Sequence, residues 1–375
     1  MKMDRVESNG FLGWLAMAVV TAIALSAAPA ARADPEGLYQ RHDLVSDQAG
    51  KADHQDGNLK NAWGIAFNPF GFVWVSDAET GVSTLYDGAG VPQSLVVTIP
   101  PAAGAAAGNP TGIVFNASSG FLVRPPAANS SAKFIFATED GVIAGWAPPV
   151  DGTHAILVKD NSSSGAQYKG LALSAGGSGS LLYATDFHNG KIDVWDTNFN
   201  PVALPSGAFT DPGIPHGFAP FGIQAINGNI YVTYAKQDAD RHDDVPGKGL
   251  GYVDVYDPNG KLLDRVVSRG PLNAPWGLAL APAGFGEFSG SLLVGNFGDG
   301  RINAFDLATG QNLGALKGQD HHPIEIEGLW GLAFGNGFNG QSVNTLFFTA
   351  GPGDEEHGLY GKIDPLPDQH GHGPH

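Results

Sequence analysis

The feature that most constrains the fold of this chain is a short apolar strand that opens on glycine and recurs six times. The six glycines are Gly64, Gly112, Gly170, Gly222, Gly277 and Gly331, with separations that run from 48 to 58 residues. A repeat of this length accommodates four short strands and their turns, and long helical patterns are absent after the first 33 residues. The chain is therefore expected to consist of six similar all-β units.

The first unit displays the order of its strands most fully. Residues 64–67 form the first apolar strand, and an Asn-Pro turn that ends in glycine leads to the second strand over 72–77. Proline and glycine favour the backbone angles that a tight turn requires. The third strand is expected over 82–87 and the outer strand over 95–99. Four strands in this order make one antiparallel blade.

The sixth unit reaches the end of its third strand with too little chain left for an outer strand. A strand-like stretch over 41–46 stands before the first unit and has no place in it. Pairing the two would close the ring by backbone hydrogen bonds and leave no open sheet edge. The sequence therefore predicts an all-β fold, a six-bladed β-propeller of four-stranded antiparallel blades, closed by an N-terminal strand that completes the last blade.

Both ends of the chain differ from the repeats in composition. Lys2 and Arg5 precede an apolar run over 11–25, and small residues around Arg32 supply a cleavage pattern. These features predict a signal peptide over 1–33 and a periplasmic or secreted protein. A single propeller domain is expected over 34–366. The histidine-rich residues 367–375 are expected to be a disordered tail, with metal chelation as the alternative.

The overall charge limits the class of partner. The net charge is −17 at pH 7, which repels phosphate backbones and anionic membranes. We expect no nucleic acid and no membrane span after signal cleavage. The expected partner is a small-molecule, glycan or protein ligand at the channel face. Because the chain has no cysteine, disulfides, thiolate metal sites and cysteine nucleophiles are excluded.

The loops on one face of such a ring bring polar residues from several blades toward the central channel. The predicted metal ligands among them are Asp77, Glu139, Asp186, Asn296 and Asp354. Calcium takes six to eight oxygen ligands, so Ca²⁺ is the cofactor that this oxygen-rich set favours. The alternative is that these side chains cap the turns in which they lie.

Histidines and tryptophans supply the remaining candidates. His188 and His357 are candidate catalytic bases, or else ordinary loop histidines. The predicted ligand-binding residues are Trp63, Trp276, Trp330 and His242. Each tryptophan directly precedes a channel glycine, and the three form either an aromatic rim for a flat ligand or packing between blades. His242 belongs to a long charged insertion over 235–250, which is either a binding-face loop or a solvated excursion.

The first repeat also carries a family resemblance. Its glycine, apolar residue and alanine, followed by Trp74-Val75-Ser76-Asp77 and Tyr86-Asp87, resemble the NHL repeat. The chain after residue 33 resembles secreted bacterial six-bladed propellers of that kind. The resemblance implies a fold shared with lactonases and esterases that hold calcium in the channel and polarise a substrate carbonyl. The resemblance implies acids and asparagines as the calcium ligands, but no motif shows which residues of this chain they are.

Two functions follow from these observations. One is an exported propeller that presents an acidic channel face for ligand, cation or partner binding. The alternative is a calcium-assisted hydrolase, lactonase or lyase with its site in the central channel. The sequence holds no Gly-x-Ser-x-Gly elbow, phosphate loop or dinucleotide fingerprint, which removes support for serine hydrolase and nucleotide chemistry.

Overall fold

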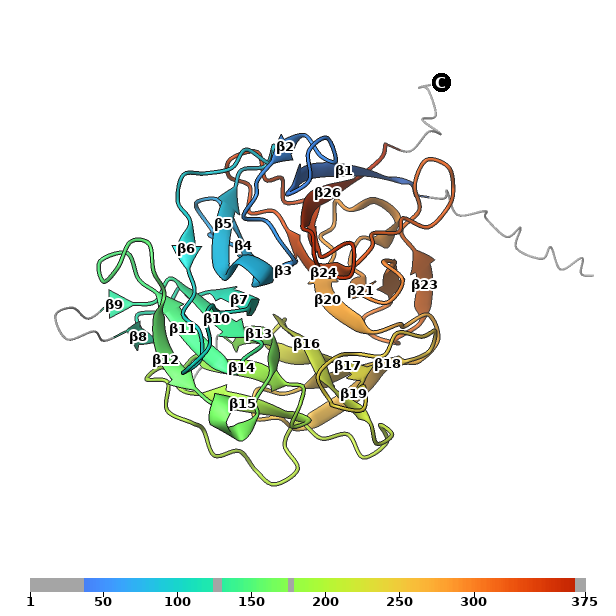
Figure 1. Ribbon diagram of the computed structural model, residues 1–375. Coiled ribbons are helices and arrows are strands. Elements are labelled where there is room, and N and C mark those ends of the chain that lie inside the picture. Colours follow the sequence, from blue (N-terminus) through green and yellow to red (C-terminus); the bar gives the residue numbers. More distant parts are fainter. Residues whose placement is uncertain (1–36, 124–129, 175–178, 368–375) are drawn as a thin grey trace, which may run out of the picture. The chain divides into compact units, whose positions relative to one another are not determined.

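Six β-sheets follow one another around a central axis in the computed structural model (Figure 1). The structure describes residues 37–123, 130–174 and 179–367. The predicted signal peptide over 1–33 and tail residues 368–375 lie outside these ranges. No helix among the described residues has the length and apolar character needed to cross a membrane.

The blades follow the chain in order, and each begins with the strand nearest the axis. Blade 1 consists of β3 (Ala62–Phe67), β4 (Val73–Asp77), β5 (Val82–Tyr86) and β6 (Val97–Thr98). Blade 2 consists of β7 (Pro110–Phe115), β10 (Phe134–Thr138), β11 (Val142–Trp146) and β12 (Ile156–Asp160), with the hairpin β8 (Leu122–Val123) and β9 (Ser130–Ser131) between its first two strands. Blade 3 consists of β13 (Tyr168–Ser174), β14 (Leu181–Asp186) and β15 (Lys191–Trp195).

The second half of the ring repeats this order. Blade 4 consists of β16 (Phe218–Ile226), β17 (Asn229–Lys236), β18 (Gly251–Tyr256) and β19 (Leu262–Ser268). Blade 5 consists of β20 (Pro275–Leu280), β21 (Leu292–Asn296), β22 (Ile302–Phe305) and β23 (Asn312–Ala315). Blade 6 consists of β24 (Leu329–Phe334), β25 (Leu346–Ala350), β26 (Leu359–Pro365), β1 (Tyr39–Ser46) and the short β2 (His54–Gln55). Three short 3₁₀ helices lie in loops: η1 (Ala78–Thr80), η2 (Ser162–Ser164) and η3 (Gly286–Phe288).

The predicted ring closure is confirmed. Strand β1 pairs antiparallel with β26, in a register that runs from Tyr39 opposite Pro365 to Ser46 opposite Leu359. The closing strand starts two residues before the predicted 41–46, because Tyr39 and Gln40 also join the ladder. The two ends of the described chain therefore meet in one sheet (Figure 1).

Blade 3 is the exception to the four-stranded pattern. After β15 the chain makes one bridge, between Trp195 and Pro201, through hydrogen bonds from the Val202 N–H to the Val194 carbonyl and from the Asp196 N–H to the Asn200 carbonyl, each 2.9 Å. It then leaves the sheet, and Pro205 follows three residues later. Proline has no N–H to continue a ladder, so this segment starts an outer strand without completing it.

The repeated glycines are explained by how closely neighbouring blades approach at the axis. A Cβ atom on Gly64 or Gly222 would overlap a backbone carbonyl oxygen of the next blade, and one on Gly277 would lie 2.6 Å from the Trp330 carbonyl oxygen. Such distances are shorter than any ordinary contact, so an alanine would force the blades apart. The repeat therefore requires glycine for space at the axis.

Threonine hydroxyls join neighbouring blades at the same level. The Thr111 hydroxyl donates to the Tyr168 carbonyl of blade 3 at 2.5 Å, and the Thr185 hydroxyl donates to the Phe221 carbonyl of blade 4 at 2.6 Å. The Thr349 hydroxyl of blade 6 donates to a carbonyl of blade 1 in the same way. Buried polar groups are costly without a partner, so these bonds fix the spacing of the inner strands.

Candidate functional site

Aromatic rings fill the axis of the propeller. Trp63 and Trp330 are each 1% exposed, and their rings stack with centroids 3.8 Å apart. Phe221 meets Trp330 edge-on at 5.8 Å, and the half-buried Trp276 meets it at 5.9 Å. The residue that directly precedes the channel glycine is thus aromatic in blades 1, 4, 5 and 6, and Phe297 after β21 also stacks on Trp330 with ring centroids 4.1 Å apart. Packing between blades explains why Trp63 and Trp330 are buried. A ligand contact at Trp63, Trp276 or Trp330 stays a prediction.

Blade 3 places a lysine where these four blades place an aromatic residue. Lys169 directly precedes the channel glycine of its blade, and its side chain is 3% exposed. The Nζ atom lies 5.3 Å from the centroid of the Trp63 ring, and the Trp276 indole N–H donates to the Lys169 carbonyl at 3.1 Å. An ammonium over an aromatic face is attracted by the ring quadrupole. The aromatic layer is therefore the floor beneath a buried cation.

Carboxylates from three other blades surround this ammonium. Glu139 follows β10 and forms an ion pair and hydrogen bond with Lys169. Asp243, from the loop between β17 and β18, places Oδ1 3.6 Å from the Nζ atom. Asp244 and Glu355 lie near enough for their charges to interact with Lys169. One buried cation thus faces four acids.

The balance of burial and charge shifts the pKa of each group. Burial opposes the charge of Lys169, but the attraction of Glu139 prevails and its pKa is raised. Burial, with the neighbouring acids, raises the pKa of Asp244 to about 7 and that of Glu355 to about 7. Burial also acts on Asp243, but the hydrogen bond from His242 and the charge of Lys169 lower its pKa. The cluster therefore holds both ionised and neutral carboxyls near neutral pH.

Glu355 is held in place by a chain of hydrogen bonds that begins at the aromatic floor. The Trp330 indole N–H donates to Asn61 Oδ1 at 2.9 Å, and Asn61 Nδ2 donates to Glu355 Oε2 at 2.6 Å. Both Asn61 and Glu355 have left-handed backbones, with φ of 44° and 68°. Non-glycine residues adopt this conformation at a cost, and such residues are concentrated at functional sites.

One group of described residues brings three possible metal ligands close together. Glu139, His242 and Asp243 each offer a ligand atom, and these atoms lie within 4.8 Å of one another. His242 Nδ1 lies 2.8 Å from Asp243 Oδ1. The long insertion predicted over 235–250 contributes two of the three residues. His242 was predicted as a ligand-binding residue and Glu139 as a metal ligand, whereas Asp243 was not singled out.

The other predicted metal ligands lie elsewhere in the described structure. Asp186 Oδ1 accepts the Gln167 N–H at 3.1 Å, and Asn296 Oδ1 accepts the Asn273 N–H at 3.1 Å, so both fasten the loop that enters their own blade. Asp77 is fully buried, and burial raises its pKa well above the ordinary value. Asp354 is exposed in a left-handed turn. Of the four predicted carboxylate ligands, only Glu139 belongs to the group of three.

The two candidate catalytic histidines are not members of the group of three. His357 Nδ1 lies 2.9 Å from Asp47 Oδ2, and the same carboxylate accepts the next backbone N–H, so this imidazole joins the closing strand to blade 6. His188 is half-buried, and its ring packs beside Gly165. A role in catalysis stays a prediction for both.

Lys169 is the residue that the sequence-based predictions left out of the site. The available signal was its position, because it is the only charged residue among the six that directly precede a channel glycine. Its partners Glu139 and Asp243 are distant in the sequence, and no local pattern joins them.

Two proteins of a mimivirus are similar to this chain over most of its length. No family model matches the chain. Uncharacterized protein R648 of Acanthamoeba polyphaga mimivirus is 35% identical over 327 residues, which cover 85% of this chain and 78% of the relative. Uncharacterized protein L690 of the same virus is 33% identical over 328 residues, which cover 85% of this chain and 84% of the relative.

Solved structures share the fold at low identity. A protein of unknown function from Bacteroides thetaiotaomicron gives a TM-score of 0.55 at 10% identity, covering 88% of this chain and 77% of that chain. Virginiamycin B lyase from Staphylococcus aureus with quinupristin gives 0.50 at 12% identity, covering 88% and 100%. A gluconolactonase from Xanthomonas campestris gives 0.50 at 15% identity, covering 83% and 88%. At these identities the similarity shows the shared propeller fold and nothing more specific.

Proposed function

Since the chain belongs to the same family as the mimivirus proteins R648 and L690 and folds as a six-bladed propeller, we propose a function from its own channel site. The protein binds a divalent cation at the channel mouth, through Glu139, His242 and Asp243, and presents that cation to a small ligand. The predicted leader is consistent with export, and the proposal places this binding in the periplasm or outside the cell.

The observation that carries the proposal is the group of three ligand atoms within 4.8 Å beside a buried ammonium. Lys169 already satisfies part of the negative charge, so these acids are arranged around a positive charge before any metal arrives. A metal that binds Glu139 and Asp243 competes with the Lys169 ammonium for the same oxygens. Metal affinity is therefore coupled to the position of Lys169.

The donor set bears on which metal is preferred. Calcium is coordinated by oxygen, whereas imidazole is a common ligand of zinc and other transition metals. Two carboxylates and one imidazole favour a zinc-type ion over the calcium that the sequence favoured. The two ions are distinguishable in one titration series.

We expect metal to stabilise the protein measurably. A ligand present at 100 times its Kd raises the free energy of unfolding by about 2.7 kcal/mol. Thermal melts after chelation should shift upward with Zn²⁺ or Mn²⁺, and less with Ca²⁺. Glu139→Gln should weaken binding at least about tenfold in calorimetric titration, because it removes a charged ligand. Lys169→Met should tighten it, since the competing ammonium is gone.

Asp354→Asn is the matched control, because Asp354 is an exposed acid of the same face that lies outside the group of three. Its metal affinity should equal that of the unmodified protein. Equal loss in Asp354→Asn and Glu139→Gln would point to nonspecific attraction of cations by an acidic surface. No shift with any of the three ions would reject the metal site.

A hydrolase or lyase activity is the second candidate, favoured by the orientation of Glu355. The chain from Trp330 through Asn61 holds this carboxyl beside Lys169, and a pKa of about 7 suits proton transfer at neutral pH. The solved virginiamycin B lyase and gluconolactonase are enzymes with the same fold, and this fold-level analogy supports an enzymatic activity for this chain.

A panel of lactones and esters tests this candidate. Turnover should fall about 10²- to 10⁴-fold in Glu355→Gln, and the pH profile of kcat should lose a limb near pH 7. Asp354→Asn, one residue away, should leave both unchanged. A Glu355→Gln variant with full activity and an unaltered pH profile would remove Glu355 from the chemistry.

A further inference from the structure

The outer edge of β15 is uncovered along most of its length. In blade 4 the equivalent strand β18 carries β19 from Tyr252 to Tyr256. Strand β15 carries only the bridge of Trp195 with Pro201 and the hydrogen bond to the Val194 carbonyl. Blade 3 therefore lacks an outer strand that its neighbours in the ring possess.

The backbone groups left at this edge can be identified from the strand geometry. The N–H and C=O of one residue point to the same side, and that side alternates along the strand. Since the Val194 carbonyl points outward to Val202, the Ile192 N–H and C=O also point outward. None of the described residues bonds to these two groups. Unpaired edge groups of this kind are a template for another strand.

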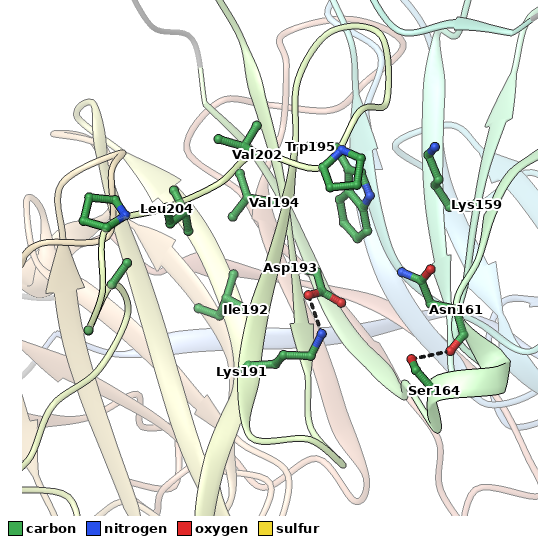
Figure 2. Close-up of a pocket in the computed structure, with 14 residues that line it drawn as sticks. Lys159, Asn161, Ser164, Lys191, Ile192, Asp193, Val194, Trp195, Val202 and Leu204 are labelled. Atoms are coloured by element: carbon green, nitrogen blue, oxygen red, sulfur yellow. Dashed lines mark hydrogen bonds and ion pairs between the residues drawn. The ribbon is translucent and has the colours of Figure 1, made fainter.

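A groove runs along the uncovered edge. It has a volume of about 470 Å³ and is lined by β15 together with the end of β12 and the segment that follows β15. Figure 2 shows Lys159 and Asn161 on one side of β15, and Val202 and Leu204 on the other. Within β15, Lys191 is exposed and Asp193 is half-buried, whereas Ile192, Val194 and Trp195 are buried.

The two walls differ in polarity. Ile192 and Val194 belong to an apolar cluster that Val202 and Leu204 extend. On the opposite wall, Asp193 takes the Lys191 ammonium at 2.5 Å and the Tyr168 hydroxyl at 2.8 Å, so its charge is balanced. No described residue pairs with the ammonium of Lys159. One wall is therefore apolar, and the other carries a net positive charge.

These observations specify an occupant. Side chains of an added strand alternate between the two walls, so one set meets apolar residues and the other meets Lys159. We propose that the β15 groove binds an extended segment of a partner protein by strand addition. The segment pairs with β15 through the Ile192 N–H and C=O, beside the part of the edge that Pro201 and Val202 already occupy, and it alternates apolar with acidic residues.

Fluorescence anisotropy with a labelled heptapeptide of alternating valine and aspartate tests this proposal on the full chain. Saturable binding is expected, and N-methylation of the peptide amides that face Ile192 should weaken it at least about tenfold. A peptide with the same residues in two blocks should bind more weakly, because only alternation matches the two walls.

Charge reversal in the groove supplies the second measurement. Lys159→Glu should weaken the aspartate peptide and strengthen a peptide of alternating valine and lysine. Lys133→Glu, at an exposed lysine outside the groove, should change neither. Thermal melts of both variants verify that the fold is retained.

Three outcomes would overturn the proposal. The first is no binding of the alternating peptide up to about 1 mM, which corresponds to a binding free energy of only about −4 kcal/mol. The second is equal binding of the N-methylated peptide, which excludes strand addition. The third is a concentration-dependent dimer that excludes the peptide, which would assign the edge to a second copy of this chain.

Discussion

Deletion of residues 38–46 is expected to abolish the single cooperative unfolding transition of the propeller. The segment contains β1, which supplies the antiparallel partner of β26 and so joins the first described residues to the last blade. Tyr39, Leu44 and Val45 are each no more than 2% exposed, and the Tyr39 hydroxyl donates to the Phe285 carbonyl at 3.0 Å. Burying side chains of this size contributes about 1.5–3 kcal/mol each, against a total stability of about 5–15 kcal/mol.

Calorimetry and urea titration measure the effect. The deletion should lower or split the transition, because blade 6 loses its outer strand and exposes the edge of β26. A truncation after residue 367 is the control, since it leaves every described strand in place. A deletion variant that melts at the same midpoint as the full chain would show that the ring does not depend on β1.

Lys169→Met is expected to be the most destabilising single substitution at the channel site. Removing one partner of a buried ion pair costs about 3–5 kcal/mol, because the remaining charges are left without compensation. Here Glu139, Asp243, Asp244 and Glu355 would face one another over an aromatic floor. Urea titration at pH 8 in the presence of chelator measures the loss.

The loss should depend on pH with a definite sign. The pKa values of Asp244 and Glu355 are raised to about 7, from ordinary values near 3.8 and 4.5. A carboxyl with a raised pKa binds its proton more tightly in the folded state, so stability falls as pH rises through 7. Without Lys169 these pKa values rise further. The difference between Lys169→Met and the unmodified protein should therefore be larger at pH 8 than at pH 5.

Arg301→Met is the control, because the side chain of Arg301 is 45% exposed and that of its partner Glu325 is 56% exposed. This is a surface ion pair, and such pairs are worth about 0–1 kcal/mol. A Lys169→Met variant that loses no more than this control, or that loses the same amount at pH 5 and pH 8, would contradict the buried-pair account.

The blades and their closure could be predicted from the sequence because the glycine pattern is local to each repeat and the strands of each unit can be counted. Each channel glycine is required by a backbone approach that recurs in every blade, so the period survives extensive change between repeats. The closing strand could be predicted because the sixth unit was one strand short, and the strand-like segment before the first unit belonged to no other blade. Pro201 and Pro205 argue against a complete outer strand in blade 3, but the repeat pattern led to the expectation of four strands in every blade.

The candidate site could be predicted only in part, because sequence identifies an acid but not the atoms that its oxygens contact. Asp186 ends the second strand of blade 3, and Glu139 directly follows the second strand of blade 2. The Asp186 oxygens are taken by backbone and side-chain donors of neighbouring loops, whereas Glu139 reaches the ammonium of Lys169. Which outcome applies depends on loop conformation, and Asp243 reaches the site only through the path of the long insertion.

The aromatic floor has a kinetic consequence for the channel site. Rings from blades 1, 4, 5 and 6 pack against one another at the axis, and Trp63 and Trp330 are buried, so these rings close the axis beneath Lys169. A ligand that reaches the acids must depart by the route through which it arrived, past the insertion that carries His242 and Asp243. If the passage beside this insertion were narrower, the association and dissociation rates of the ligand would fall by the same factor. The ligand would then stay bound for longer, while its Kd would be unchanged.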